Sequence, residues 1–150
     1  MKSAIRLAYN FIFKTKQRKV TVKSVFYAAV ARFRIFCFPG NRLHRYLGEE
    51  GVETGTEIPE TEQQKKIALV SRRVARVAAR VPWESKCLVQ AMVAQRLLRD
   101  YRIESTLYLG VGRNKEDNDK MVAHAWLRSG PYYVIGGRGE SYATVAKFKM

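Results

Sequence analysis

The sequence predicts an α+β fold, with helices first and an antiparallel sheet in the last third of the chain. Up to Asp100, apolar residues recur at three- and four-residue spacing, which is typical of helices with one buried face. After Tyr101 the pattern changes to alternation among β-branched and aromatic residues, which favours strands. A chain of 150 residues with 47% hydrophobic and 27% charged residues is long and apolar enough for one compact core.

The first part of the chain is expected to be helical and basic. Residues 3–13 have the spacing of a short amphipathic helix that a basic cluster ends. Residues 23–38 have the spacing of a longer helix, which Pro39 and Gly40 stop. Residues 43–47 add one more turn.

A polar stretch rich in Gly and Thr, residues 48–60, follows these helices and is typical of a linker. We therefore expect an N-terminal helical region with its linker, residues 1–58, and a core, residues 59–150.

The core is expected to begin with two helices. From Glu62 to Arg80, apolar residues lie on one face and Lys and Arg around the others, which indicates a solvated basic surface. Pro82 ends this helix, and Ser85 is a good N-cap for the next. Cys87 then falls in the first turn of the second helix.

Three strands are expected after these helices. Residues 105–111 alternate, residues 122–128 follow a polar loop, and residues 132–135 follow a turn at Gly130 and Pro131. Strands joined by such short connections pair antiparallel.

The two cysteines lie in unlike surroundings and do not indicate a disulfide framework. Cys37 lies in an apolar run, Phe36 to Phe38, and is expected to be a buried core residue. Cys87 is the candidate nucleophile, because unpaired N–H groups and the positive end of the helix dipole stabilise a thiolate in a first turn.

His124 is the candidate base. Strand alternation places it on one face with Val122 and Trp126. A single strand histidine is more often structural, and Trp126 is expected to be a packing residue. A helix-start Cys followed by a strand His is, however, the chain order of papain-like and transglutaminase-like cores, in which the helix packs on the sheet and brings imidazole to thiol.

An ordered set of segments then makes the chain resemble the B2 leader peptidases of lasso-peptide gene clusters. The segments that carry the resemblance are Pro82–Ala91, Leu97–Arg99, Thr106–Val111 and Ala123–Trp126. The resemblance implies a cysteine peptidase that removes the leader from a ribosomally made precursor, so that a separate cyclase closes the ring. It also implies a leader-binding B1 partner protein and no cofactor.

By this resemblance, Cys87 attacks the carbonyl at the junction between leader and core peptide. His124 first takes the thiol proton and then gives it to the leaving amine. Water hydrolyses the acyl-enzyme, and the Cys87 N–H is expected to donate a hydrogen bond to the oxyanion.

The third catalytic residue departs from the family pattern. The family typically has an Asp on the strand after the histidine, but residues 134–137 contain no acid here, and the only later acidic residue is Glu140. Three alternatives remain: Glu140 orients the imidazole, a backbone carbonyl orients it, or the enzyme uses a Cys/His pair alone. The last two are favoured.

The net charge of +15 supports a different class of function, a module that binds nucleic acid or a membrane surface. Residues 14–23 and 65–80 are the basic segments, but no known nucleic-acid-binding motif is present, so nucleic acid is not the expected partner. An amine acyltransferase with the same Cys/His pair and an inactive scaffold are two further alternatives.

No metal site is expected, because two cysteines and two histidines are too few and too dispersed. No export signal is recognised, and no run approaches about 18 consecutive apolar residues, so a cytoplasmic protein without a transmembrane span is expected.

Overall fold

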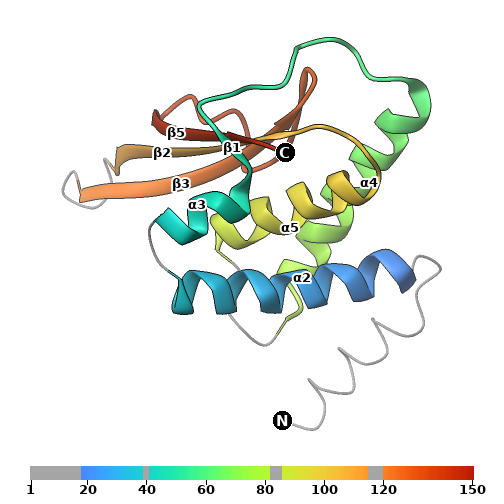
Figure 1. Ribbon diagram of the computed structural model, residues 1–150, viewed down its shortest axis with the longest axis horizontal. Helices are drawn as coiled ribbons and strands as arrows, with labels where there is room; N and C mark the ends of the chain where they lie inside the picture. The colour runs from blue at the N-terminus through green and yellow to red at the C-terminus, as the bar shows by residue number, and fades with distance from the viewer. Residues whose placement is uncertain (1–17, 39–40, 82–85, 115–119) are drawn as a thin grey trace, which may run out of the picture.

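The computed structural model describes residues 18–38, 41–81, 86–114 and 120–150. In this part of the chain, helices cover one face of a five-stranded antiparallel sheet, and the first of the four described helices packs behind the others, away from the sheet (Figure 1). The arrangement confirms the predicted α+β fold.

The described helices match the predicted ones with small changes in their ends. α2 (Arg18–Cys37) begins earlier than predicted, α3 (Asn41–Leu47) is the short extra turn, and α4 (Thr61–Ala78) and α5 (Cys87–Asp100) open the core. The helix predicted at residues 3–13 lies outside the described residues. No helix of the described part is long and apolar enough to cross a membrane.

The sheet has the order β1-β5-β2-β3-β4, and every pair in it is antiparallel. The predicted strands are confirmed as β2 (Thr106–Asn114), β3 (Lys120–Ser129) and β4 (Tyr132–Ile135). β1 (Glu49–Glu50) and β5 (Ala143–Lys149) are not among the predicted strands. The sequence does contain a signal from which β5 could have been predicted, because its last residues alternate between apolar residues and Lys.

α5 is the centre of the core, since it packs against α2, α4 and the sheet. Its side chains at Ala91 and Leu98 are completely buried. On the sheet, alternate residues Leu107, Ala125 and Leu127 turn toward the helices. Burying one such aliphatic side chain contributes about 1.5–3 kcal/mol, and Leu98→Ala is expected to cost about 2–5 kcal/mol.

Cys37 is exposed, so the expectation that it lies in the core is wrong. It is the last residue of α2 and follows Phe36, which is also exposed. The apolar run is therefore part of the outward face of α2. Apolar neighbours in the sequence do not show that a residue lies in the core when the helix turns these apolar side chains outward.

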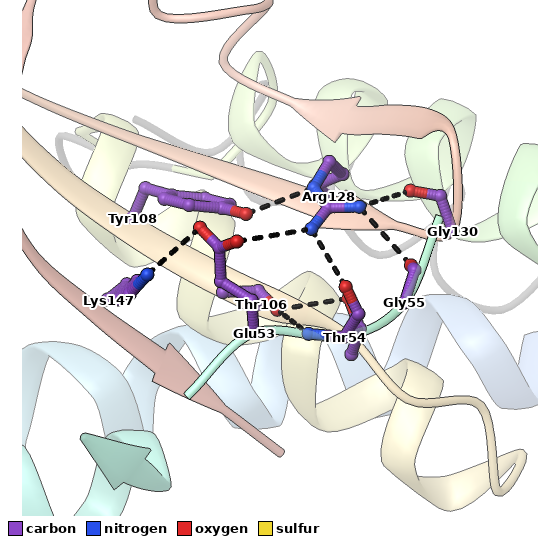
Figure 2. Close-up of polar contacts among 8 residues, drawn as sticks. All are labelled: Glu53, Thr54, Gly55, Thr106, Tyr108, Arg128, Gly130 and Lys147. Carbon is purple, nitrogen blue, oxygen red and sulfur yellow. Dashed lines mark hydrogen bonds and ion pairs between the residues drawn. The ribbon is translucent and has the colours of Figure 1, made fainter. Parts of the chain in front are cut away.

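The predicted linker is irregular, and a buried arginine holds it to the sheet. Arg128 donates hydrogen bonds from Nη2 to the Thr54 carbonyl at 2.9 Å and from Nη1 to the Gly55 carbonyl at 3.3 Å. Its Nε donates to Tyr108 Oη at 3.0 Å, and its Nη1 also donates to the Gly130 carbonyl at 2.7 Å. Figure 2 shows these contacts on the face of the sheet away from the helices.

Two further contacts complete this polar cluster. The Thr54 N–H donates to Thr106 Oγ1 at 2.8 Å, and the Glu53 carboxylate lies 3.4 Å from Lys147 Nζ. Burial raises the pKa of Tyr108, although Arg128 opposes the shift, so its hydroxyl stays protonated and able to donate. The cluster ties the segment after β1 to β2 and β3, while the division of the chain at residue 58 stays a prediction.

Candidate active site

Cys87 is the first residue of α5, as predicted. Lys86 holds the N-cap position with extended backbone and makes no side-chain capping bond, and Ser85, the predicted cap, lies outside the described residues. Cys87 is partly buried against the core. The N–H groups of the first turn lack intrahelical acceptors, so they and the helix dipole favour a thiolate there.

His124 lies on β3 opposite Gly110 of β2, and its ring is held by one hydrogen bond and two stacked rings. Nε2 lies 2.8 Å from the carbonyl oxygen of Gly136. The ring stacks on Tyr142, with 4.6 Å between centroids, and on its other neighbour, Trp126, at 6.1 Å. A carbonyl only accepts hydrogen bonds, so Nε2 carries the proton and Nδ1 is the basic nitrogen of the neutral ring.

The segment between β4 and β5 supplies both contacts, and glycines let it approach. A Cβ on Gly136, whose φ is +81°, would lie 2.4 Å from the Ala125 carbonyl oxygen. A Cβ on Gly139 would lie 2.5 Å from the Trp126 ring. Tyr142, which follows these glycines, was not identified as a candidate from the sequence.

Gly110 makes room for the same segment from the β2 side. A Cβ there would lie 2.7 Å from the Trp126 ring and 3.0 Å from Tyr142 Cβ. Trp126 is buried and stacks on Tyr108, with 5.4 Å between centroids, so its predicted packing role is confirmed. The imidazole therefore lies within a row of aromatic rings, between Trp126 and Tyr142.

Cys87 and His124 are not in contact through a hydrogen bond in the described structure. Cys87 packs against the core cluster that contains Ala125 and Leu127, whereas His124 leaves β3 on the alternate face with Trp126. The pairing of thiol and imidazole therefore stays a prediction, with Nδ1 as the nitrogen available to the thiol.

Glu140 is exposed and does not reach the imidazole. Its carboxylate lies 3.7 Å from the Arg138 guanidinium, and both side chains are more than two-thirds exposed. Of the three alternatives for the orienting group, the backbone carbonyl is the one that the structure shows in contact with His124.

An open hollow of about 320 Å³ lies at the other end of β3. Its walls come from the tethered linker, the loop after α5, and the residues Ser129 and Gly130. Neither Cys87 nor His124 lines it, so it is separate from the candidate site. Within the described ranges, no group of three or more His, Cys, Asp or Glu side chains is arranged to hold a metal ion.

Comparison with protein families assigns most of the chain. A model of the transglutaminase-like superfamily matches residues 30–148, a segment that contains Cys87, His124, the strands β1 to β4 and all of β5 except its last residue. Searches of curated proteins and of solved structures find no match.

Proposed function

Because the chain belongs to the transglutaminase-like superfamily, whose members are typically cysteine-dependent catalysts, we propose that it is a cysteine peptidase with Cys87 as nucleophile and His124 as base. The observation that carries the proposal is the position of Cys87 at the start of α5, the central helix of the matched segment. A thiolate is most stable at such a helix start.

The proposed reaction has two steps. Cys87 Sγ attacks the peptide carbonyl carbon while His124 Nδ1 takes the thiol proton, and the first-turn N–H of Cys87 donates to the developing oxyanion. His124 then returns the proton to the leaving amine, and a thioester remains. In the second step water, deprotonated by the same nitrogen, hydrolyses the thioester and restores the thiol. The Gly136 carbonyl keeps Nε2 protonated throughout, so Nδ1 is the nitrogen that cycles.

The proposed substrate is the leader of a ribosomally synthesised lasso-peptide precursor. The resemblance of residues 82–91 and 123–126 to the B2 proteins supports this substrate class. The proposed partners are a B1 protein, which grips the leader, and a cyclase, which uses the freed core peptide. The charge of +15 suits an acidic leader–partner surface.

The first experiment combines the purified chain, the precursor and the B1 protein, and measures product masses. We expect two peptides whose masses sum to the precursor plus one water. Cys87→Ala and His124→Ala are each expected to lower the cleavage rate by about 10²–10⁴-fold. Cys37→Ala is the matched control, because that exposed thiol lies on α2 and should leave the rate unchanged. Cleavage that survives Cys87→Ala would rule the mechanism out.

A second experiment tests the meeting of thiol and imidazole without any substrate. In a Cys37→Ala background, the rate of Cys87 alkylation by iodoacetamide is followed against pH. If His124 holds the thiolate, alkylation continues well below pH 8, and His124→Ala restores the profile of an ordinary thiol. Identical profiles for the two proteins would show that His124 does not act on Cys87.

An amine acyltransferase is the second candidate, because the superfamily that matches is named for such chemistry. The same acyl-enzyme would then be captured by an amine rather than by water. Repeating the cleavage assay with an added primary amine distinguishes the two, since transfer yields a joined product. If neither product forms and Cys87 reacts as an ordinary thiol, the chain is an inactive scaffold.

A further inference from the structure

α2 turns small side chains inward and carries several large apolar side chains on its outward face, while Tyr27 and Ile35 are partly buried against the core. The residues buried against the rest of the protein are Val20, Thr21, Ser24, Ala28 and Ala31. The outward residues include Val22, Phe26, Phe33 and Phe36, which are 42%, 62%, 60% and 88% exposed. A surface helix normally shows the opposite pattern, as α4 does. The outward face of α2 is thus built for contact with something apolar.

These four residues, which we call the α2 outer face, recur at spacings of four, seven and three. This spacing places them in one stripe along the helix. They extend over most of α2, so the stripe is longer than a single side-chain contact would need. Exposed apolar stripes of this kind mark interaction sites.

The charge beside the stripe is entirely positive. α2 contains no Asp or Glu, and its exposed cations Arg18 and Lys19 lie one turn from Val22, a member of the stripe. Two other cations of α2 are directed elsewhere: Lys23 pairs with Asp100 at 2.7 Å, and Arg34 lies over the Tyr46 ring.

We propose that the α2 outer face binds an anionic lipid surface, with the phenylalanines in the interfacial layer and the flanking cations at the phosphates. Aromatic residues on one side and Lys or Arg beside them are the features of helices that lie in a membrane interface. The site is separate from Cys87 chemistry and does not depend on the proposed function.

A second copy of the chain is the weaker occupant. Pairing two α2 outer faces would bring Arg18 and Lys19 of one protomer near their own copies in a parallel pair, or near Arg32 of the other protomer in an antiparallel pair. No acidic residue of α2 would offset the repulsion. An anionic bilayer offers both the apolar layer and the negative charge that this helix lacks.

The test measures sedimentation of the full chain with vesicles. We expect binding to phosphatidylcholine vesicles that contain phosphatidylglycerol, weaker binding at high salt, and little binding to phosphatidylcholine alone. Phe26→Ser with Phe33→Ser should weaken binding by at least about tenfold, whereas Phe26→Leu with Phe33→Leu should retain it. Both pairs replace exposed side chains, and a circular dichroism melt checks that each variant folds.

The matched control removes charge from another helix. Arg72→Gln with Arg76→Gln takes two exposed cations from α4 and leaves the α2 outer face intact. This variant should lose less binding than the Phe→Ser pair. If the two variants bind equally, or if the Arg variant loses more, general positive charge explains the binding and the proposal is wrong.

Cys37 offers a direct reporter at the end of the helix. With Cys87→Ser, an environment-sensitive dye on Cys37 should shift its emission to the blue when anionic vesicles are added. An unchanged spectrum overturns the proposal. An absence of vesicle binding also overturns it. A dimer that the Phe→Ser pair dissociates would then identify a second copy of the chain as the occupant of the α2 outer face. Binding to the B1–leader complex that the same pair abolishes would identify that complex as the occupant.

Discussion

The two ends of β3 hold their polar side chains in different ways. At one end, Arg128 is 8% exposed and donates four hydrogen bonds to groups from three parts of the chain. At the other end, His124 is partly exposed and has one hydrogen bond, to Gly136, with one nitrogen left unused. A saturated buried cation can only hold structure, whereas a half-saturated imidazole retains the capacity to move a proton.

Arg128→Ala should have the largest effect on stability. It removes a buried cation and leaves the carbonyl of Thr54 and the hydroxyl of Tyr108 without their partner, which is expected to cost about 3 kcal/mol. Urea unfolding measures this loss. Arg138→Ala, which removes an exposed arginine paired only with Glu140, is the control and should cost less than about 0.5 kcal/mol. Equal losses of stability in the two variants would mean that the hydrogen bonds of Arg128 stabilise the fold no more than an exposed ion pair does.

Substitutions at two neighbouring glycines distinguish the effect of backbone strain from the effect of moving the carbonyl that contacts His124. Gly136→Ala combines a positive φ with a Cβ that meets the Ala125 carbonyl, and is expected to cost about 2–4 kcal/mol. Gly137→Ala has a similar φ but open space around its Cβ, and is expected to cost about 1–2 kcal/mol. Thermal melts give the stability, and Cys87 alkylation should change only for Gly136→Ala. The same alkylation change in both variants would contradict a specific role for the Gly136 carbonyl.

Substitutions at Tyr142 test whether its ring positions the imidazole of His124. Tyr142→Ala removes the ring that stacks on the imidazole, which is worth about 0.5–1.5 kcal/mol. We expect a loss of about three- to tenfold in cleavage rate, because the base is less well positioned. Tyr142→Phe keeps the ring and should keep the rate. If Phe and Ala behave alike, the stack does not position His124.

The smallest effect is expected from an ion pair at the surface, at the C-terminal end of α5. Burial alone would raise the pKa of Asp100, but hydrogen bonds from Lys23 and Tyr27 outweigh it and hold the pKa below its ordinary value. The folded state therefore binds the proton of Asp100 less tightly, and the stabilisation present above about pH 4 is lost as the pH falls through the folded pKa.

Asp100→Asn should lower stability at pH 7 by less than about 1 kcal/mol and should make stability less sensitive to acid. Denaturant unfolding at pH 7 and at pH 3 gives both numbers. A difference between the two proteins that is as large at pH 3 as at pH 7 would mean that the charge of Asp100 is not the cause.

Most of the fold could be predicted because periodicity reports burial. α4 and α5 were found from their apolar faces, β2 from alternation, and β3 and β4 from the polar loop and the turn that precede them. β5 was missed because its first residues, which include an exposed Val145, do not alternate as its last residues do. Cys37 was misplaced because the outward face of α2 also carries large apolar side chains, such as Phe36 beside Cys37.

The candidate site could be predicted only where side-chain chemistry marks it. Cys87 and His124 are identified by residue type and by the elements that carry them. The contact that orients His124 comes from a backbone carbonyl, which every residue possesses, so no residue type points to Gly136. Two partners of Arg128, Thr54 and Gly55, lie more than 70 residues earlier in the chain, and no local pattern indicates them.

The position of β5 in the sheet has a consequence for how the protein folds. β5 is inserted between β1 and β2, and Glu49 pairs with Lys149. β2, β3 and β4 follow one another in the chain and can pair early. β5 must pair with β2 on the edge away from β3 and β4, and β1, from a distant part of the chain, must then pair with β5. Such high contact order slows folding. Refolding is therefore expected to show an early hairpin and a late, rate-limiting closure of the sheet.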